Sequence, residues 1–114
     1  WKYLKTNLEQ FDKIIIVGDF NSNAIWDEWD RWWNHSDVVA ILNEKGIKSV
    51  YHQKMNENQG NETHPTFFLQ RKKEKAYHID YIFTSQHFTS DKIHIGKYEN
   101  WIEISDHVPL TYEN

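Results

Sequence analysis

The stretch Lys13-Ile14-Ile15-Ile16-Val17-Gly18-Asp19-Phe20-Asn21 decides the fold expected for this chain. Its four consecutive β-branched residues leave no polar side, so the run predicts a strand over residues 13–17 that is buried on both faces. Gly18 lets this strand end in a tight turn. Asp19 and Asn21 then lie just beyond the carboxyl end of the strand, where polar side chains meet solvent and ligands.

The segments around this strand alternate between helical and extended patterns. An apolar stripe at helical spacing, formed by Trp1, Leu4, Leu8 and Phe11, predicts a helix over residues 1–11. A second helix is expected between Ser36, a good N-cap, and Gly46, which suits a helix end. Strands are expected at 47–52, 66–70, 77–84, 93–98 and 108–112, and a polar loop at 53–64. This order predicts a mixed α/β (α+β) fold.

The composition predicts one folded domain, residues 1–114. Hydrophobic residues make up 39% of the 114 residues and aromatic residues 16%, which supplies enough apolar area for a core. The absence of cysteine excludes disulfides and thiolate zinc sites, and the compartment stays open. No apolar run approaches the roughly 20 residues of a membrane span, and the first residues carry no signal-peptide pattern. We therefore expect a water-soluble chain with a truncated N-terminus.

The formal net charge of −4 has the wrong sign for a protein that holds nucleic acid mainly by neutralising phosphates. Carboxylates gathered around a divalent cation count as negative in that sum, so phosphate chemistry is not excluded. The basic run at residues 71–75 is interpreted as a solvated hairpin tip, or alternatively as a contact for substrate phosphates.

Residues 22–35 are acidic and rich in tryptophan. Trp26, Trp29 and Trp33 share helical spacing within this segment. The simpler interpretation is that these rings pack a loop or short helix onto the core, and the alternative is an aromatic wall that faces a substrate.

Two later motifs also place reactive side chains beside strand-forming residues: His78-Ile79-Asp80-Tyr81-Ile82-Phe83 and Ser105-Asp106-His107-Val108-Pro109-Leu110. A carboxylate within an apolar strand is costly without a basic partner, so Asp80 is expected to pair. His107 can be that partner, because a neighbouring carboxylate favours the imidazolium. Metal-assisted phosphodiester cleavage needs such groups, together with oxygen ligands for Mg²⁺ or Mn²⁺ and a donor to phosphate.

Each motif also has a simpler interpretation when taken alone. Asp19 and Asn21 can build an Asx turn, and residues 105–107 can form the turn into a strand. A calcium loop of the EF-hand type is a further alternative, with ligands at Asp19, Asn21, Asn23, Asp27 and Asp30, although position 6 lacks glycine. The other histidines show no ligand spacing, and only His64 and His78 stand out by their position.

Taken together, the three motifs resemble the catalytic motifs of the endonuclease/exonuclease/phosphatase superfamily, the DNase I-like metal-dependent phosphoesterases. The resemblance implies that Asp19 orients the attacking water and that Asn21 donates to a phosphate oxygen. It implies that His107 contacts the scissile phosphate and that Asp80 holds this histidine. It further implies Mg²⁺ or Mn²⁺ as cofactor, bound by Asp106 and Asp19. Thr66 with Phe67 matches a pair of structural importance.

The resemblance runs from about residue 10 to the end and covers the second half of the superfamily's domain. That domain is a two-sheet sandwich of two similar halves, so we expect one mainly antiparallel sheet with flanking helices. The first half normally supplies an Asn and a metal-binding Glu. A single sheet exposes an apolar face, so the missing N-terminal half or self-association is expected to cover it.

The function implied by the resemblance is hydrolysis of a phosphodiester substrate, with nucleic acid as the leading substrate class. Sphingomyelinase-like and small phosphodiester substrates remain open. The inositol-phosphatase branch usually carries Cys-Asp-Arg where this chain has residues 78–81, which argues against that branch. The alternative is a non-catalytic binding or interaction module that retains the fold and the motifs.

Overall fold

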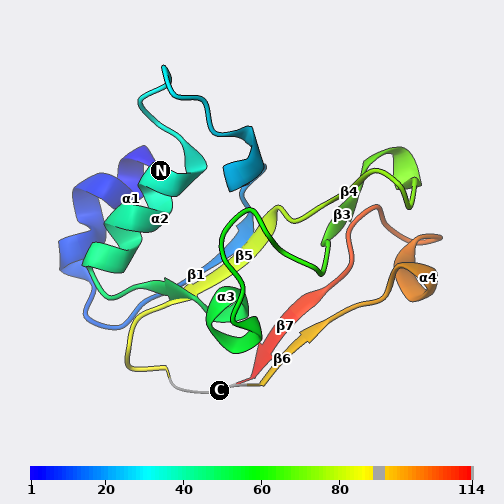
Figure 1. The fold of residues 1–114 in the computed structure, drawn as a ribbon. Coiled ribbons are helices and arrows are strands. Elements are labelled where there is room, and N and C mark those ends of the chain that lie inside the picture. Colours follow the sequence, from blue (N-terminus) through cyan, green and yellow to red (C-terminus); the bar gives the residue numbers. More distant parts are fainter. Residues whose placement is uncertain (89–91, 114) are drawn as a thin grey trace.

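The computed structural model describes residues 1–88 and 92–113 as a mixed α/β fold (Figure 1). The described helices are α1 (Lys2–Asn7), α2 (His35–Glu44), α3 (Val50–Met55) and α4 (Tyr98–Trp101), with 3₁₀ turns η1 (Leu8–Gln10), η2 (Ala24–Trp26) and η3 (Leu69–Arg71). The described strands are β1 (Ile15–Asp19), β2 (Lys48–Ser49), β3 (Phe67–Phe68), β4 (Ala76–Tyr77), β5 (Asp80–Thr84), β6 (Lys92–Ile95) and β7 (Leu110–Glu113). The predicted fold class is confirmed.

The described strands pair in antiparallel fashion and form three small sheets. One has three strands in the order β1-β5-β2, and the others are the pairs β3-β4 and β6-β7. The single sheet expected from the sequence is therefore divided, since His78 and Ile79 separate β4 from β5. Figure 1 shows the β6-β7 hairpin running alongside β5, with α1 and α2 on the other side of β1.

The core is built on both faces of β5. Tyr81 and Phe83 pack into a cluster with Leu42 of α2 and with α1 and η1, while Ile82 joins Val50 and Tyr51 of α3 in a second cluster. Successive side chains of a strand point to opposite faces, so an apolar run of this kind serves two cores. The two-sided burial predicted for residues 13–17 occurs at β5 instead.

Strand β1 differs from its prediction because only one of its faces is covered. Ile14 and Ile16 pack against the cluster around Leu42, whereas Ile15 and Val17 are 43% and 62% exposed. The run of β-branched residues correctly indicates an extended backbone, but it does not report what covers each face.

The helix at residues 36–46 forms with different caps. Asn34 is the N-cap in place of Ser36, and its backbone N–H donates to Oδ2 of Asp37 at 2.7 Å. Ser36 instead donates its hydroxyl to Asp27. Gly46 ends the helix with φ +74°, as predicted, because a residue without Cβ adopts this conformation at low cost.

Several predicted strands are shorter than expected. Residues 50–52 belong to α3, because Val50 and Tyr51 face the second core cluster at helical spacing together with Met55. Residues 69–70 fall in η3, and the segment after Ile95 turns into α4. The helix over residues 1–11 forms as α1 followed by η1, with Leu8 buried. Among the described residues, no helix has the length and apolarity that a membrane crossing requires.

Candidate active site

The register of β1 and β5 brings two acidic residues to the same edge of the sheet. The two strands pair from Ile15↔Thr84 to Asp19↔Asp80, so the last residue of β1 lies opposite the first residue of β5. The pairing continues one step further, because the Phe20 N–H donates to the carbonyl of Ile79 at 2.9 Å. Two motifs separated by some 60 residues therefore meet through backbone hydrogen bonds.

The chain leaves β1 through an Asx turn. Oδ1 of Asp19 accepts the backbone N–H of Asn21 at 2.8 Å, and Asn21 adopts φ +49°. This turn is the simple interpretation of the first motif. It does not prevent a role for Asp19 in a site, because the turn uses Oδ1 and leaves Oδ2 directed toward His107. The Asn21 side chain is exposed beside this turn.

His107 joins the two acidic residues. Its Nδ1 lies 2.9 Å from Oδ2 of Asp80, and its Nε2 lies 3.8 Å from Oδ2 of Asp19. One ligand atom from each of the three residues lies within 4.8 Å of the others. The His107, Asp19 and Asp80 side chains are 31%, 37% and 20% exposed, so a substrate can reach them. The predicted Asp80–His107 pair is confirmed.

Thr66 binds the backbone of the segments that carry Asp80 and His107. Its side chain is fully buried, and Oγ1 accepts the backbone N–H groups of Ile79 at 3.1 Å and Asp80 at 3.2 Å. The Thr66 carbonyl accepts the N–H of Val108 at 2.9 Å. Phe67 and His107 form an isolated antiparallel β-bridge through their backbones, and the centroids of their rings lie 4.9 Å apart. The predicted structural role of the Thr66-Phe67 pair is confirmed, since one residue ties the Asp80 and His107 segments together.

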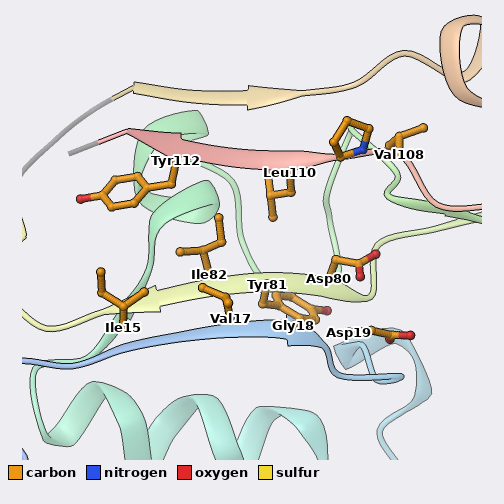
Figure 2. A pocket seen from close by; sticks show the side chains of 11 residues that line it. Ile15, Val17, Gly18, Asp19, Asp80, Tyr81, Ile82, Val108, Leu110 and Tyr112 are labelled. Carbon is orange, nitrogen blue, oxygen red and sulfur yellow. The ribbon is translucent and has the colours of Figure 1, made fainter.

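A groove of about 540 Å³ runs from this cluster between the β1-β5 strands and β7. Figure 2 shows Asp19 and Asp80 at one end, with Ile15 and Tyr112 at the other end and Val17, Ile82 and Leu110 between them. The groove is thus polar where the acidic residues lie and apolar along its length.

The geometry fixes what each atom of His107 can do. Because Asp80 carries an acceptor oxygen, Nδ1 is the nitrogen that carries a proton toward it, and Nε2 is directed to Asp19 and solvent. Nε2 can therefore donate to a bound oxyanion when protonated, or act as a ligand or base when neutral. Two carboxylates and one imidazole also form a donor set suited to Mn²⁺ or to a hydrated Mg²⁺.

The predicted metal ligands are only partly assembled. Asp19 belongs to the cluster, whereas the cluster found among the described residues does not include the Asp106 carboxylate. The carbonyl of Asp106 accepts the Phe68 N–H at 2.7 Å, so its backbone helps to align β3 with the His107 segment. The participation of Asp106 in metal binding stays a prediction.

The calcium-loop alternative is wrong. Nδ2 of Asn23 donates to the His78 carbonyl at 2.8 Å and to Oε1 of Glu62 at 2.7 Å, so this amide is buried in the core. Asp27 binds Ser36 instead. These two predicted ligands therefore do not converge with Asp19 on one cation.

A buried polar network behind the cluster was not predicted. Nε2 of His52 lies 3.1 Å from Oε2 of Glu62, and Nδ1 of His78 donates to the His64 carbonyl at 2.7 Å. Burial alone would raise the pKa of Glu62, but hydrogen bonds led by those from His52 and Asn23 lower it to about 2. Burial lowers the pKa of His78. The positions of His64 beside Pro65 and of His78 beside Asp80 were the sequence features that pointed here.

The basic run lies on the turn between β3 and β4. Nζ of Lys73 pairs with Oε1 of Glu99 at 2.9 Å, and both side chains are exposed. Nη1 of Arg71 approaches the Glu103 carbonyl at 3.4 Å. The interpretation as a solvated hairpin tip is confirmed, while contact with substrate phosphates stays a prediction.

Comparison with known proteins adds no family assignment for this chain. Scans against protein-family models, curated proteins and solved structures find no match. Any functional conclusion therefore depends on the motifs and on the geometry of Asp19, Asp80 and His107.

Proposed function

We propose that this chain is a metal-dependent phosphoesterase that hydrolyses phosphodiesters, with nucleic acid as the leading substrate class. One observation carries the proposal: Asp19, Asp80 and His107 come from three separate motifs and meet within 4.8 Å at one end of a groove. The motifs resemble those of the endonuclease/exonuclease/phosphatase superfamily, in which residues of these types act together. Their convergence supports the proposal because a chance resemblance would not require it.

Each residue has a role that follows from its position. Asp80 orients His107 through Nδ1, so that Nε2 meets a phosphate oxygen. Oδ2 of Asp19 lies 3.8 Å from Nε2, and this oxygen, which the Asx turn does not use, can orient or deprotonate a water molecule. Asn21 follows in the turn, and its amide is the expected donor to phosphate. Bound Mg²⁺ or Mn²⁺ would neutralise charge on the phosphate, with Asp19 and Asp106 as the proposed ligands.

The test is hydrolysis of bis(p-nitrophenyl) phosphate and of supercoiled plasmid DNA by the purified protein in MgCl₂ or MnCl₂, with and without EDTA. We expect turnover that EDTA abolishes and that Asp19→Asn or Asp106→Asn lowers by about 100-fold or more. Asp12→Asn, an exposed carboxylate before β1, is the matched control and should retain activity. Metal-independent turnover would contradict the proposal, and binding without turnover would favour the non-catalytic module.

We also propose that a further chain segment or a second copy covers the apolar part of the groove. Val17 and Ile15 are exposed there, beside Leu110 and Ile82. Contiguous apolar surface of this kind favours association. If a second copy covers the groove, light scattering should show a mass above 13.9 kDa that rises with concentration, and Val17→Lys should shift the protein toward the monomer. A cooperatively folded monomer at all concentrations would contradict a second copy.

A further inference from the structure

The segment from η2 to the start of α2 presents large apolar side chains to solvent. Figure 1 shows this segment projecting past α1 and α2, away from the sheets. We call residues 25–33 the tryptophan loop. Trp29 is 98% exposed and Trp32 is 80% exposed, and Ile25 and Trp26 are about half exposed beside them. Such exposure of two indole rings is unusual for a folded domain, where Trp is mostly buried.

The tryptophans of the loop divide into anchors and outward-facing rings. Trp33 packs edge-on against Trp1 with ring centroids 6.2 Å apart, and Nζ of Lys5 lies 4.2 Å from its ring centroid. At the other end, Trp26 lies 5.2 Å from the ring of Tyr77. The expected packing onto the body of the domain is therefore correct for these two residues and wrong for Trp29. The Trp32 ring lies 5.3 Å from the Trp33 ring between centroids and still faces solvent.

Hydrogen bonds hold the loop in this shape. The Arg31 guanidinium donates to the Trp26 carbonyl at 2.8 Å and to Oδ1 of Asn34 at 2.8 Å. Nδ2 of Asn34 donates to the carbonyls of Glu28 at 2.8 Å and of Arg31 at 3.0 Å. The backbone N–H of Glu28 donates to Oδ1 of Asn34 at 3.1 Å. These hydrogen bonds hold the loop backbone in a shape that presents both rings to solvent, which lowers the backbone entropy lost when the rings bind.

The charges of the loop select among possible partners. Asp27, Glu28 and Asp30 outnumber Arg31, whose guanidinium is already bound within the loop. This acidic balance disfavours phosphate backbones and anionic lipid surfaces. Indole rings favour the interfacial zone of a bilayer, and aromatic faces beside carboxylates attract quaternary ammonium groups. A choline-headed bilayer offers both, because its outermost charge is a trimethylammonium group.

We propose that the tryptophan loop is a docking surface for a zwitterionic, choline-headed lipid surface, into which Trp29 and Trp32 insert. The loop needs no conformational change to present both rings. Because the acidic residues Asp27, Glu28 and Asp30 lie in the same loop as the rings, neutral choline-headed membranes bind the loop more tightly than anionic membranes do. This surface is independent of the proposed hydrolysis, and its test requires no turnover.

The experiment is co-sedimentation of the protein with dioleoylphosphatidylcholine vesicles, compared with vesicles that contain phosphatidylglycerol. The double variant Trp29→Ala/Trp32→Ala should reduce the partition coefficient by about tenfold or more. Tyr3→Ala removes another exposed ring, on α1, and should leave partitioning unchanged. In the unaltered protein, brominated phosphatidylcholine should quench tryptophan fluorescence, which tests insertion without a substitution.

Three results would overturn the proposal. The first is no sedimentation with phosphatidylcholine vesicles, or equal sedimentation of the double variant. The second is stronger binding to phosphatidylglycerol vesicles or to single-stranded DNA, which would assign the rings to a polyanion. The third is a concentration-dependent dimer that the double variant abolishes in sedimentation velocity, which would assign them to a second copy of this chain.

Discussion

Replacing His107 with Ala is expected to lower kcat/KM for a phosphodiester by about 1,000-fold while the fold remains intact. The imidazole lies against both carboxylates, with Nδ1 2.9 Å from Asp80 and Nε2 3.8 Å from Asp19. Removal of a positioned acid or base typically costs 100-fold to 10,000-fold, and loss of a donor to the developing charge acts on the same step. Because the side chain is 31% exposed, its truncation leaves little cavity.

Steady-state kinetics with bis(p-nitrophenyl) phosphate in saturating Mn²⁺ measures this effect, and thermal unfolding checks the fold. His94→Ala is the matched control, because His94 is an exposed histidine on β6. Asp80→Asn should also lower activity strongly. Combined with His107→Ala it should add little, since Asp80 acts through that imidazole. Activity of His107→Ala within a few-fold of the unaltered protein would refute the assigned role.

The sequence predicts those parts of the site that follow from the free energy of placing a residue in its own segment of the chain. A carboxylate in an apolar strand needs a partner, which identifies Asp80 and leads to His107. The expectation that Gly18 ends the first strand is wrong, because β1 continues through Gly18 to Asp19, and the turn begins only at the Asp19 side chain. The role of Asp106 as a metal ligand stays a prediction, because adjacency to His107 in the sequence does not determine which side chain enters the cluster. Its backbone carbonyl, bound to Phe68, is the part that the fold employs.

The parts that could not be predicted depend on partners distant in the sequence. Residues 53–64 have the composition of a solvated loop, yet Glu62 is buried between His52 and Asn23. Local pattern cannot reveal this burial, because the amide of Asn23 comes from the turn after β1, some 40 residues earlier. Likewise the exposure of Val17 depends on what covers the sheet and not on the strand's own residues.

Thr66→Val is expected to destabilise the protein by about 2–4 kcal/mol, more than its nearly unchanged volume would suggest. Valine replaces the hydroxyl with a methyl group, and the N–H groups of Ile79 and Asp80 then lose the Oγ1 acceptor that each contacts at 3.1 and 3.2 Å. A buried donor without a partner costs about 1–3 kcal/mol, and two are affected here. Thr66 is fully buried, so water does not replace the lost acceptor at that position.

Urea unfolding monitored by tryptophan fluorescence measures this loss, with two variants as references. Thr66→Ser keeps the hydroxyl and should lose clearly less stability than Thr66→Val. Thr111→Val on β7 is the matched control, because the Thr111 side chain is exposed and its hydroxyl contacts the His94 carbonyl at 3.4 Å. It should change stability by less than about 0.5 kcal/mol.

The same substitution separates the role of Thr66 in the site from its role in stability. Oγ1 holds the first residue of β5, so its loss should shift Asp80 relative to His107 and lower kcat by about tenfold under conditions where the variant is folded. Thr111→Val should not change kcat. If Thr66→Val is destabilised but keeps full kcat, Thr66 supports the core alone, and the alignment of Asp80 depends on its pairing with Asp19 in the β1-β5 ladder.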